Sequence, residues 1–162
     1  MRWRASRPQL KREPLGGGRE DSVIDGGAAA TFGWAWLVAT VALGLHVADE
    51  ATHDFLAWYN PRALRIRQSL QGLPFPPTFT FYPWVLGLGA SVLILAALTP
   101  FAYRGVLWVR PVAYGLAGIH ILNGLLHVVG SLVERRPVPG VLSAPLLLAS
   151  GSWLGYAAAH LT

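Results

Sequence analysis

One group of ionisable side chains lies at the end of the first long apolar stretch of the sequence. It comprises His46, Asp49 and Glu50, and His53 follows three residues later. On a helix that turns about 100° per residue, Glu50 lies about 40° from His46, and His53 lies about 20° from it on the other side. Asp49 flanks them at about 60°. We therefore expect these side chains to share one face of a helix.

A second polar group lies inside a later apolar stretch and consists of His120, Asn123 and His127. Offsets of three and seven residues again place side chains on one helical face. Ionisable groups in such stretches are unfavourable unless they are paired or hydrated, so they are candidates for a functional site.

Imidazoles and carboxylates are ligands of Zn²⁺ and of non-haem iron. The sequence therefore predicts a divalent metal site, zinc or iron, with these candidate ligands: His46, Glu50, His127, His120 and His53. Catalytic roles are predicted for Glu50 and Asp49, because a carboxylate beside a metal can act as a base. Asn123 is also assigned to the catalytic group, as the residue that orients a histidine. Without a metal, a His–Glu pair can relay protons or act as a general acid and base.

Other catalytic chemistries lack the residues that they need. The chain has no cysteine, which excludes thiolate metal sites and thiol catalysis. It has no Gly-x-Ser-x-Gly elbow and no phosphate-binding or dinucleotide-binding glycine loop.

The composition is that of a membrane protein. Of the 162 residues, 53% are hydrophobic and 13% are charged, against a usual charged share of about 25%. Four stretches lack formal charge: Gly26–Ala48, Gln68–Tyr103, Pro111–Val133 and Pro137–Thr162. Each is long enough for the roughly 20 residues that cross a bilayer core. This pattern argues against a soluble enzyme, a disordered chain and a nucleic-acid-binding module.

We expect an all-α fold, a four-transmembrane-helix bundle over residues 28–162 that follows a short disordered basic N-terminal tail over residues 1–27. The predicted spans are residues 28–48, 79–98, 111–133 and 141–159. Between the first two, the polar segment 49–67 carries Asn60-Pro61, which we expect to stop a helix.

Basic residues near the helix ends predict the orientation. With the N-terminus inside, the inner segments carry 8 basic residues and the outer segments carry 5. The positive-inside rule then predicts a multi-pass protein of the bacterial plasma membrane with both termini in the cytoplasm. The first and third spans run in the same direction, so His46 and His127 should lie at one level, with His160 on the opposite side.

Three motifs resemble those of the HXXEE-domain membrane proteins. They are His46–Glu50 (His-Val-Ala-Asp-Glu), Asn123–His127 (Asn-Gly-Leu-Leu-His) and a basic Pro-Gly turn over residues 135–140. The resemblance spans about residues 30–160 and implies a four-helix membrane domain suspected of being enzymatic. The first acid of the motif is Asp49 rather than glutamate, and His53 and His120 lie outside the motifs.

The leading functional hypothesis is an intramembrane or interfacial enzyme that carries out metal-assisted hydrolysis or oxidation of a lipid-like or amphipathic substrate. One alternative is a small proton- or cation-coupled transporter, although no repeated half is visible in the sequence. Another is a non-catalytic membrane subunit whose polar groups hold helices together. No nucleic-acid partner is expected, because the basic residues of the tail accompany no nucleic-acid-binding motif.

Overall fold

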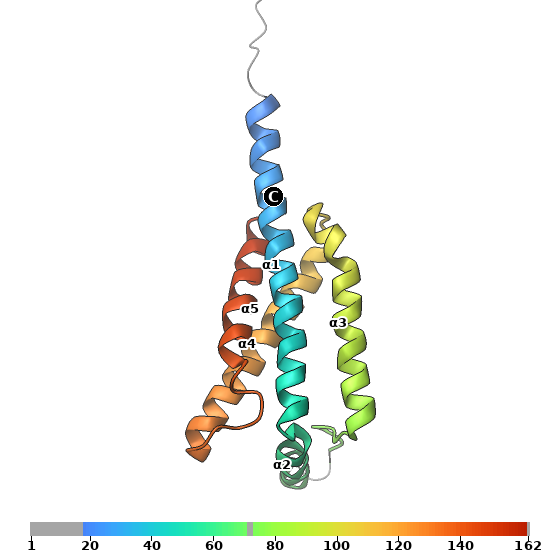
Figure 1. Cartoon of the computed structure of the whole chain (residues 1–162), viewed down its shortest axis with the longest axis vertical. Coiled ribbons are helices and arrows are strands. Elements are labelled where there is room, and N and C mark those ends of the chain that lie inside the picture. The colour runs from blue at the N-terminus through green and yellow to red at the C-terminus, as the bar shows by residue number, and fades with distance from the viewer. Residues whose placement is uncertain (1–17, 71–72, 162) are drawn as a thin grey trace, which may run out of the picture.

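The computed structural model describes residues 18–70 and 73–161 of the chain. Within these residues the regular structure is helical, which confirms the all-α prediction (Figure 1). The helices are α1 (Gly18–Thr52), α2 (Phe55–Ser69), α3 (Phe81–Tyr103), α4 (Val109–Glu134) and α5 (Ala144–Ala159).

Four of these helices form an elongated bundle. Helix α1 packs against α3 on one side and α5 on the other, and α4 packs mainly against α5. Helix α2 lies across the end of α1, where Figure 1 shows it almost along its own axis. Thus α2 closes one end of the bundle.

Three helices, not four, are long and apolar enough to cross a membrane. They are the Gly26–Thr52 part of α1, α3 and α4. Helix α5 has 16 residues and is about 24 Å long, less than the roughly 30 Å of a bilayer core. The four-span prediction is therefore wrong at the last helix, because the uncharged window from Pro137 begins with non-helical chain that reaches Ser143.

Helix α2 was not predicted, and the expected helix stop at Asn60-Pro61 is wrong. Pro61 lies inside α2, where it removes one backbone hydrogen bond but leaves the rest of the helix in place. The chain breaks earlier, at Asp54, which adopts a left-handed conformation with φ of 53°. Asparagine and aspartate tolerate this conformation better than other residues with a side chain.

Contacts to the end of α4 hold α2 in place. The Trp58 indole donates a hydrogen bond to Glu134 Oε1 at 2.9 Å, and Arg62 forms an ion pair with the same carboxylate. The Arg62 guanidinium also lies over the Trp58 ring, 4.3 Å from its centroid. These contacts anchor α2, in which Ala63 is the one described residue that is fully buried.

Helix α1 begins at Gly18, ahead of the first predicted span at residue 28. No proline follows Pro14 until Pro61, so none interrupts the start of this helix. Residues 1–17 of the predicted tail lie outside the described residues.

The apolar core lies toward the end of the bundle opposite α2. Phe32, Trp36 and Ala39 of α1 are fully buried there, and the Trp36 indole donates a hydrogen bond to the carbonyl of Leu95 on α3. Ala29 and Leu161 both lie against Gly105 in the α3–α4 connection. The first buried residues of α1 and the last described residue, Leu161, therefore lie at the same end of the bundle. The side of the membrane that this end faces stays a prediction.

Candidate metal centre

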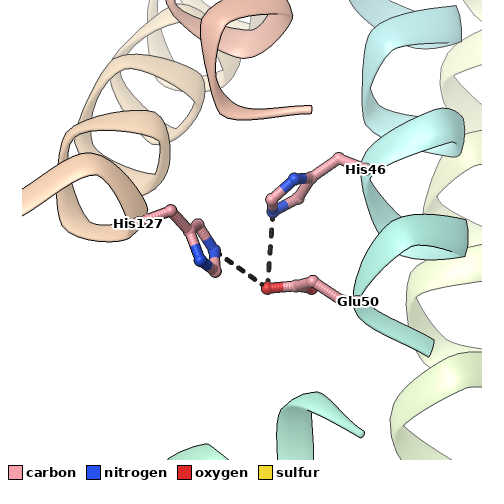
Figure 2. A group of neighbouring side chains, drawn as sticks. All are labelled: His46, Glu50 and His127. Atoms are coloured by element: carbon pink, nitrogen blue, oxygen red, sulfur yellow. Dashed lines mark ion pairs between the residues drawn. The ribbon is translucent and has the colours of Figure 1, made fainter. Parts of the chain in front are cut away.

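Three buried side chains from two helices meet near the end of the bundle that α2 closes. Figure 2 shows His46 and Glu50 on α1 and His127 on α4 pointing toward one another. His46 Nε2 lies 3.4 Å from Glu50 Oε1, and His127 Nε2 lies 3.1 Å from the same oxygen. The three ligand atoms all lie within 4.8 Å of one another. The structure thus brings together three of the five predicted metal ligands.

Helix geometry accounts for this arrangement. His46 and Glu50 are one turn apart on α1, so both project to the same side. Helix α4 runs in the same direction as α1 (Figure 1) and brings His127 to the level of this turn. The two imidazole rings lie edge to face with centroids 4.9 Å apart.

The connection between α4 and α5 packs directly on His127. Arg135 ends α4 in a left-handed conformation, and the chain turns again at Gly140, where φ is 88°. A Cβ atom at Gly140 would lie 2.6 Å from Cε1 of His127 and 2.9 Å from Nε2. Only glycine fits, because both the backbone conformation and the imidazole exclude a side chain.

Aromatic rings from α2 complete the surroundings of His127. The Phe55 ring centroid lies 5.8 Å from that of His127, and the Trp58 centroid lies 6.4 Å away. Because α2 was not predicted, these neighbours were missed by the sequence analysis. They leave the two imidazoles and the carboxylate at most 4% exposed.

Asn123 and Asp49, two of the predicted catalytic residues, lie beside the cluster. The Asn123 amide donates a hydrogen bond to His46 Nε2 at 2.9 Å. Asp49 faces α5 instead, where its Oδ2 accepts hydrogen bonds from the Ser143 backbone N–H at 3.0 Å and from the Ser143 hydroxyl at 2.7 Å.

His53 and His120 do not join the cluster. His53 is half exposed and lies with Nδ1 2.9 Å from Asp49 Oδ1. His120 is buried deeper in the bundle, where its Nδ1 lies 3.3 Å from the Ser150 hydroxyl of α5. Among the described residues, neither belongs to a group of three possible ligands.

Ser143 was missed as a member of the polar network. Its hydroxyl lies 2.7 Å from His46 Nδ1, so it links α5 to the cluster. In the sequence, a serine just before an apolar helix predicts a helix cap. That prediction does not indicate a contact to His46, almost a hundred positions earlier in the chain.

A cavity of about 650 Å³ opens beside Glu50, between the end of α1, α2 and the start of α3. Its lining includes the aromatic side chains Phe55, Phe79, Phe81 and Trp84. Asp54, Asn60 and Thr80 supply polar groups. The cavity is therefore mostly apolar, with the carboxylate of Glu50 at one side.

Hydrogen bonds from α2 fix the chain that forms one wall of this cavity. The Asn60 side chain donates to the carbonyl of Phe79 at 2.9 Å and accepts from its N–H at 3.1 Å. The Tyr59 hydroxyl donates to the carbonyl of Pro77 at 3.0 Å. Burial raises the pKa of Tyr59, so the phenol remains a donor at neutral pH.

A family model described as "Protein of unknown function with HXXEE motif" matches residues 36–154, which include the whole cluster. Comparison with curated proteins gave no match. Comparison with solved structures gave none either.

Proposed function

Because the chain belongs to the HXXEE-motif family, and the histidine and the second acid of that motif lie in the buried cluster, we propose that the cluster is a metal centre. His46, Glu50 and His127 bind one divalent ion, zinc or iron. The protein is an enzyme in the membrane or at its surface that hydrolyses or oxidises a lipid-like substrate.

The observation that carries this proposal is the spacing of the donor atoms. Two ligands, each about 2.1 Å from a zinc ion and at a tetrahedral angle, are separated by about 3.4 Å. The two imidazole nitrogens lie 3.4 Å and 3.1 Å from the same oxygen of Glu50. The two imidazole nitrogens lie within 4.8 Å of each other, so an ion fits the cluster once the two rings move closer together.

The chemistry of the donors supports the same conclusion. Two histidines and one carboxylate form the protein part of many catalytic zinc sites and of non-haem iron sites, in which coordination positions stay open for substrate. Burial of three such groups without a compensating ligand is unfavourable. His127 Nδ1 is also buried and has no hydrogen-bond partner among the described residues, so the polar contact of this ring is the one that its Nε2 makes with Glu50.

The cavity beside Glu50 supports the choice of substrate. Its volume of about 650 Å³ is within the usual range of roughly 300–1,000 Å³ for small-molecule sites. Aromatic walls suit an apolar chain, and the polar groups near Glu50 suit an ester, amide or alcohol head. Substrates of this kind are available to a protein with three apolar helices that can span a membrane.

The side chains then have separate tasks. His46 and His127 bind the ion, and Asn123 restrains the His46 ring through its amide. Glu50 lines the cavity, and the carboxylate oxygen that does not bind the ion can accept a proton from a substrate or from water. When bound, a divalent ion supplies a Lewis acid that polarises the substrate.

Metal titration of the purified protein in nanodiscs tests the centre. After treatment with a chelator, wild-type protein should bind one equivalent of Zn²⁺ by calorimetry and by elemental analysis. His46→Ala, Glu50→Gln and His127→Ala should each abolish this binding. His160→Ala is the control, because that ring lies at the other end of α5 and contacts the carbonyl of Tyr156.

Failure of wild-type protein to bind Zn²⁺ or Fe²⁺, or unchanged binding in His127→Ala, would refute the metal centre. A purely structural cluster would give another pattern, in which the truncations lower thermal stability equally with and without metal, and Glu50→Gln has little effect.

Turnover is tested with a panel of single-chain esters, amides and alcohols in the same nanodiscs, followed by mass spectrometry. Zinc-loaded or iron-loaded wild-type protein should convert at least one member, and Glu50→Gln should convert none. Metal binding without conversion of any member would contradict the lipid-like substrate and leave the metal centre in place.

A further inference from the structure

A chain of short hydrogen bonds runs from His46 through Ser143 to Asp49. The Ser143 hydroxyl lies 2.7 Å from His46 Nδ1 and 2.7 Å from Asp49 Oδ2. The other oxygen of Asp49 lies 2.9 Å from His53 Nδ1. Both carboxylate oxygens are therefore held, and the carboxylate has a fixed orientation toward α5.

The donors and acceptors in this chain allow one direction. An ionised carboxylate only accepts hydrogen bonds, so the Ser143 hydroxyl donates toward Asp49. Its other acceptor is the Gly140 carbonyl at 3.1 Å, which also only accepts. Because a hydroxyl has a single proton, Ser143 must accept from His46, and His46 Nδ1 must carry the hydrogen.

The opposite side of the ring agrees with this assignment. A neutral imidazole with hydrogen on Nδ1 has a lone pair on Nε2. The Asn123 amide donates to Nε2 at 2.9 Å, as a lone pair there requires. The same nitrogen lies 3.4 Å from Glu50 Oε1, and two such acceptors are compatible when a cation lies between them, as in the proposed centre. The hydrogen bonds of Ser143 and Asn123, on opposite sides of the ring, therefore favour one tautomer.

The Ser143 hydroxyl takes part in these hydrogen bonds instead of capping its own helix. It occupies the N-cap position of α5, yet its side chain makes no capping hydrogen bond. Serine at this position ordinarily accepts a hydrogen bond from a backbone N–H of the first helical turn. Here Asp49, from another helix, binds the Ser143 N–H, and the hydroxyl is directed to His46.

We propose that Asp49 and Ser143 are positioning residues, which act through the Ser143 hydroxyl to hold His46 in the Nδ1–H tautomer and direct the Nε2 lone pair into the cluster. The inference rests on the proposed function only in naming a divalent ion as the group that this lone pair binds. Outer carboxylates that orient metal-binding histidines act in the same way, although usually by direct contact with the ring.

The tautomer can be measured without any metal. In ¹⁵N-histidine-labelled protein treated with chelator, long-range ¹H–¹⁵N spectra at neutral pH should show a protonated Nδ1 and an unprotonated Nε2 for His46, assigned by its loss in His46→Gln. Ser143→Ala removes the acceptor and should give a mixture of tautomers. Asp49→Asn should do the same, because an amide can donate to Ser143 and free its hydroxyl to donate to His46.

Zinc affinity provides a second readout. Ser143→Ala and Asp49→Asn should weaken Zn²⁺ binding by about 10–100-fold, and Ser143→Thr, which keeps the hydroxyl, should restore affinity close to wild type. Ser150→Ala is the matched control, since it removes a serine hydroxyl of α5 that contacts the buried His120. It should change the signals of His120 and leave those of His46 and the zinc affinity unaltered.

The outcomes separate this inference from the metal centre. An Nε2–H tautomer of His46 in wild-type protein, or the same tautomer in wild type and Ser143→Ala, would overturn the positioning role even if zinc binds. If the tautomer changes as expected and wild type binds no divalent metal, the positioning role holds and the proposed function is refuted.

Discussion

Helix α4 carries two buried histidines two turns apart, His127 and His120, and each is at most 2% exposed. Each also has one buried ring nitrogen with no hydrogen-bond partner in the part of the chain that the structure describes. By burial and by hydrogen bonding the two positions are hardly distinguishable.

Their neighbours are different. His127 meets a carboxylate and a second imidazole, Glu50 and His46, at ligand distances. Among the described residues, the hydrogen-bond partner of the His120 ring is a serine hydroxyl, on α5. Burial of a histidine is therefore a poor sign of a site, and convergence of several donor atoms from separate helices is a better one.

Each of these histidines also packs against a glycine. Gly140 lies against the imidazole ring of His127, while Gly151 of α5 lies against the Cβ atom of His120 and the carbonyl of Ala117. The first glycine determines where a ring lies. The second allows α4 and α5 to approach closely.

The largest difference should come from truncating the two histidines. His127→Ala removes a ligand and should lower zinc affinity by more than the roughly 100-fold upper range for removing a supporting residue. His120→Ala should leave affinity and stoichiometry unchanged and lower only thermal stability. Calorimetric titration together with thermal unfolding checks both; equal losses of zinc binding would remove the distinction between the two positions.

Double variants sharpen the same comparison. Once His127→Ala has abolished the centre, adding His46→Ala should cause almost no further loss of activity, because residues that act as a unit are non-additive. Adding His120→Ala should instead lower stability by the amount seen in the single variant, because separated sites contribute independently. Kinetics and unfolding of wild type, the three single variants and the two double variants measure both effects, and additive losses of activity for His46 and His127 would contradict a single centre.

The two glycines should respond differently to alanine. Gly140→Ala forces a strained backbone and displaces the His127 ring, so it should destabilise the fold by about 1–3 kcal/mol and also weaken zinc binding. Gly151→Ala overpacks the α4–α5 contact and should destabilise by about 1–3 kcal/mol with zinc binding retained. The informative measurement is zinc affinity at a temperature where both variants are folded; full affinity in Gly140→Ala would show that the turn does not position His127.

The smallest effect is expected where α2 meets α4. Glu134→Gln weakens the ion pair with Arg62, so backbone amides of α2 should exchange faster with deuterium, while zinc stoichiometry stays at wild-type level. Unchanged exchange would mean that this ion pair does not help to hold α2 on the bundle. The control is Arg65→Gln, because the Arg65 side chain donates its hydrogen bond to the carbonyl of Pro61, within α2 itself.

Helical periodicity was enough to predict the core of the site. His46 and Glu50 are four residues apart, and His127 belongs to a later helix of the same direction, so their meeting depends on regular geometry alone. The same geometry explains why Asp49 points elsewhere, since it lies about 100° around the helix from Glu50. Its actual partner, Ser143, could not be predicted, because a non-helical connection has no periodicity to follow.

Helix α2 shows a different limit of the sequence analysis. Its arginines and Pro61 are typical of a polar connection, and only tertiary contacts such as the Trp58–Glu134 hydrogen bond make the helix favourable. The length of α5 shows a third limit, because an uncharged window gives the extent of apolar sequence but not where the helix begins.

The short α5 has a consequence for the surrounding lipid. The connection over residues 135–143 returns to the level of His127 before α5 begins, which leaves this helix about 6 Å shorter than an average hydrocarbon core. A bilayer relieves such hydrophobic mismatch by becoming thinner beside the short segment. In a bilayer that the three apolar helices span, we expect thinning at this end to draw headgroups and water toward Glu50. The shortening that brings Ser143 to His46 would then also move the aqueous boundary toward the cavity that Glu50 lines.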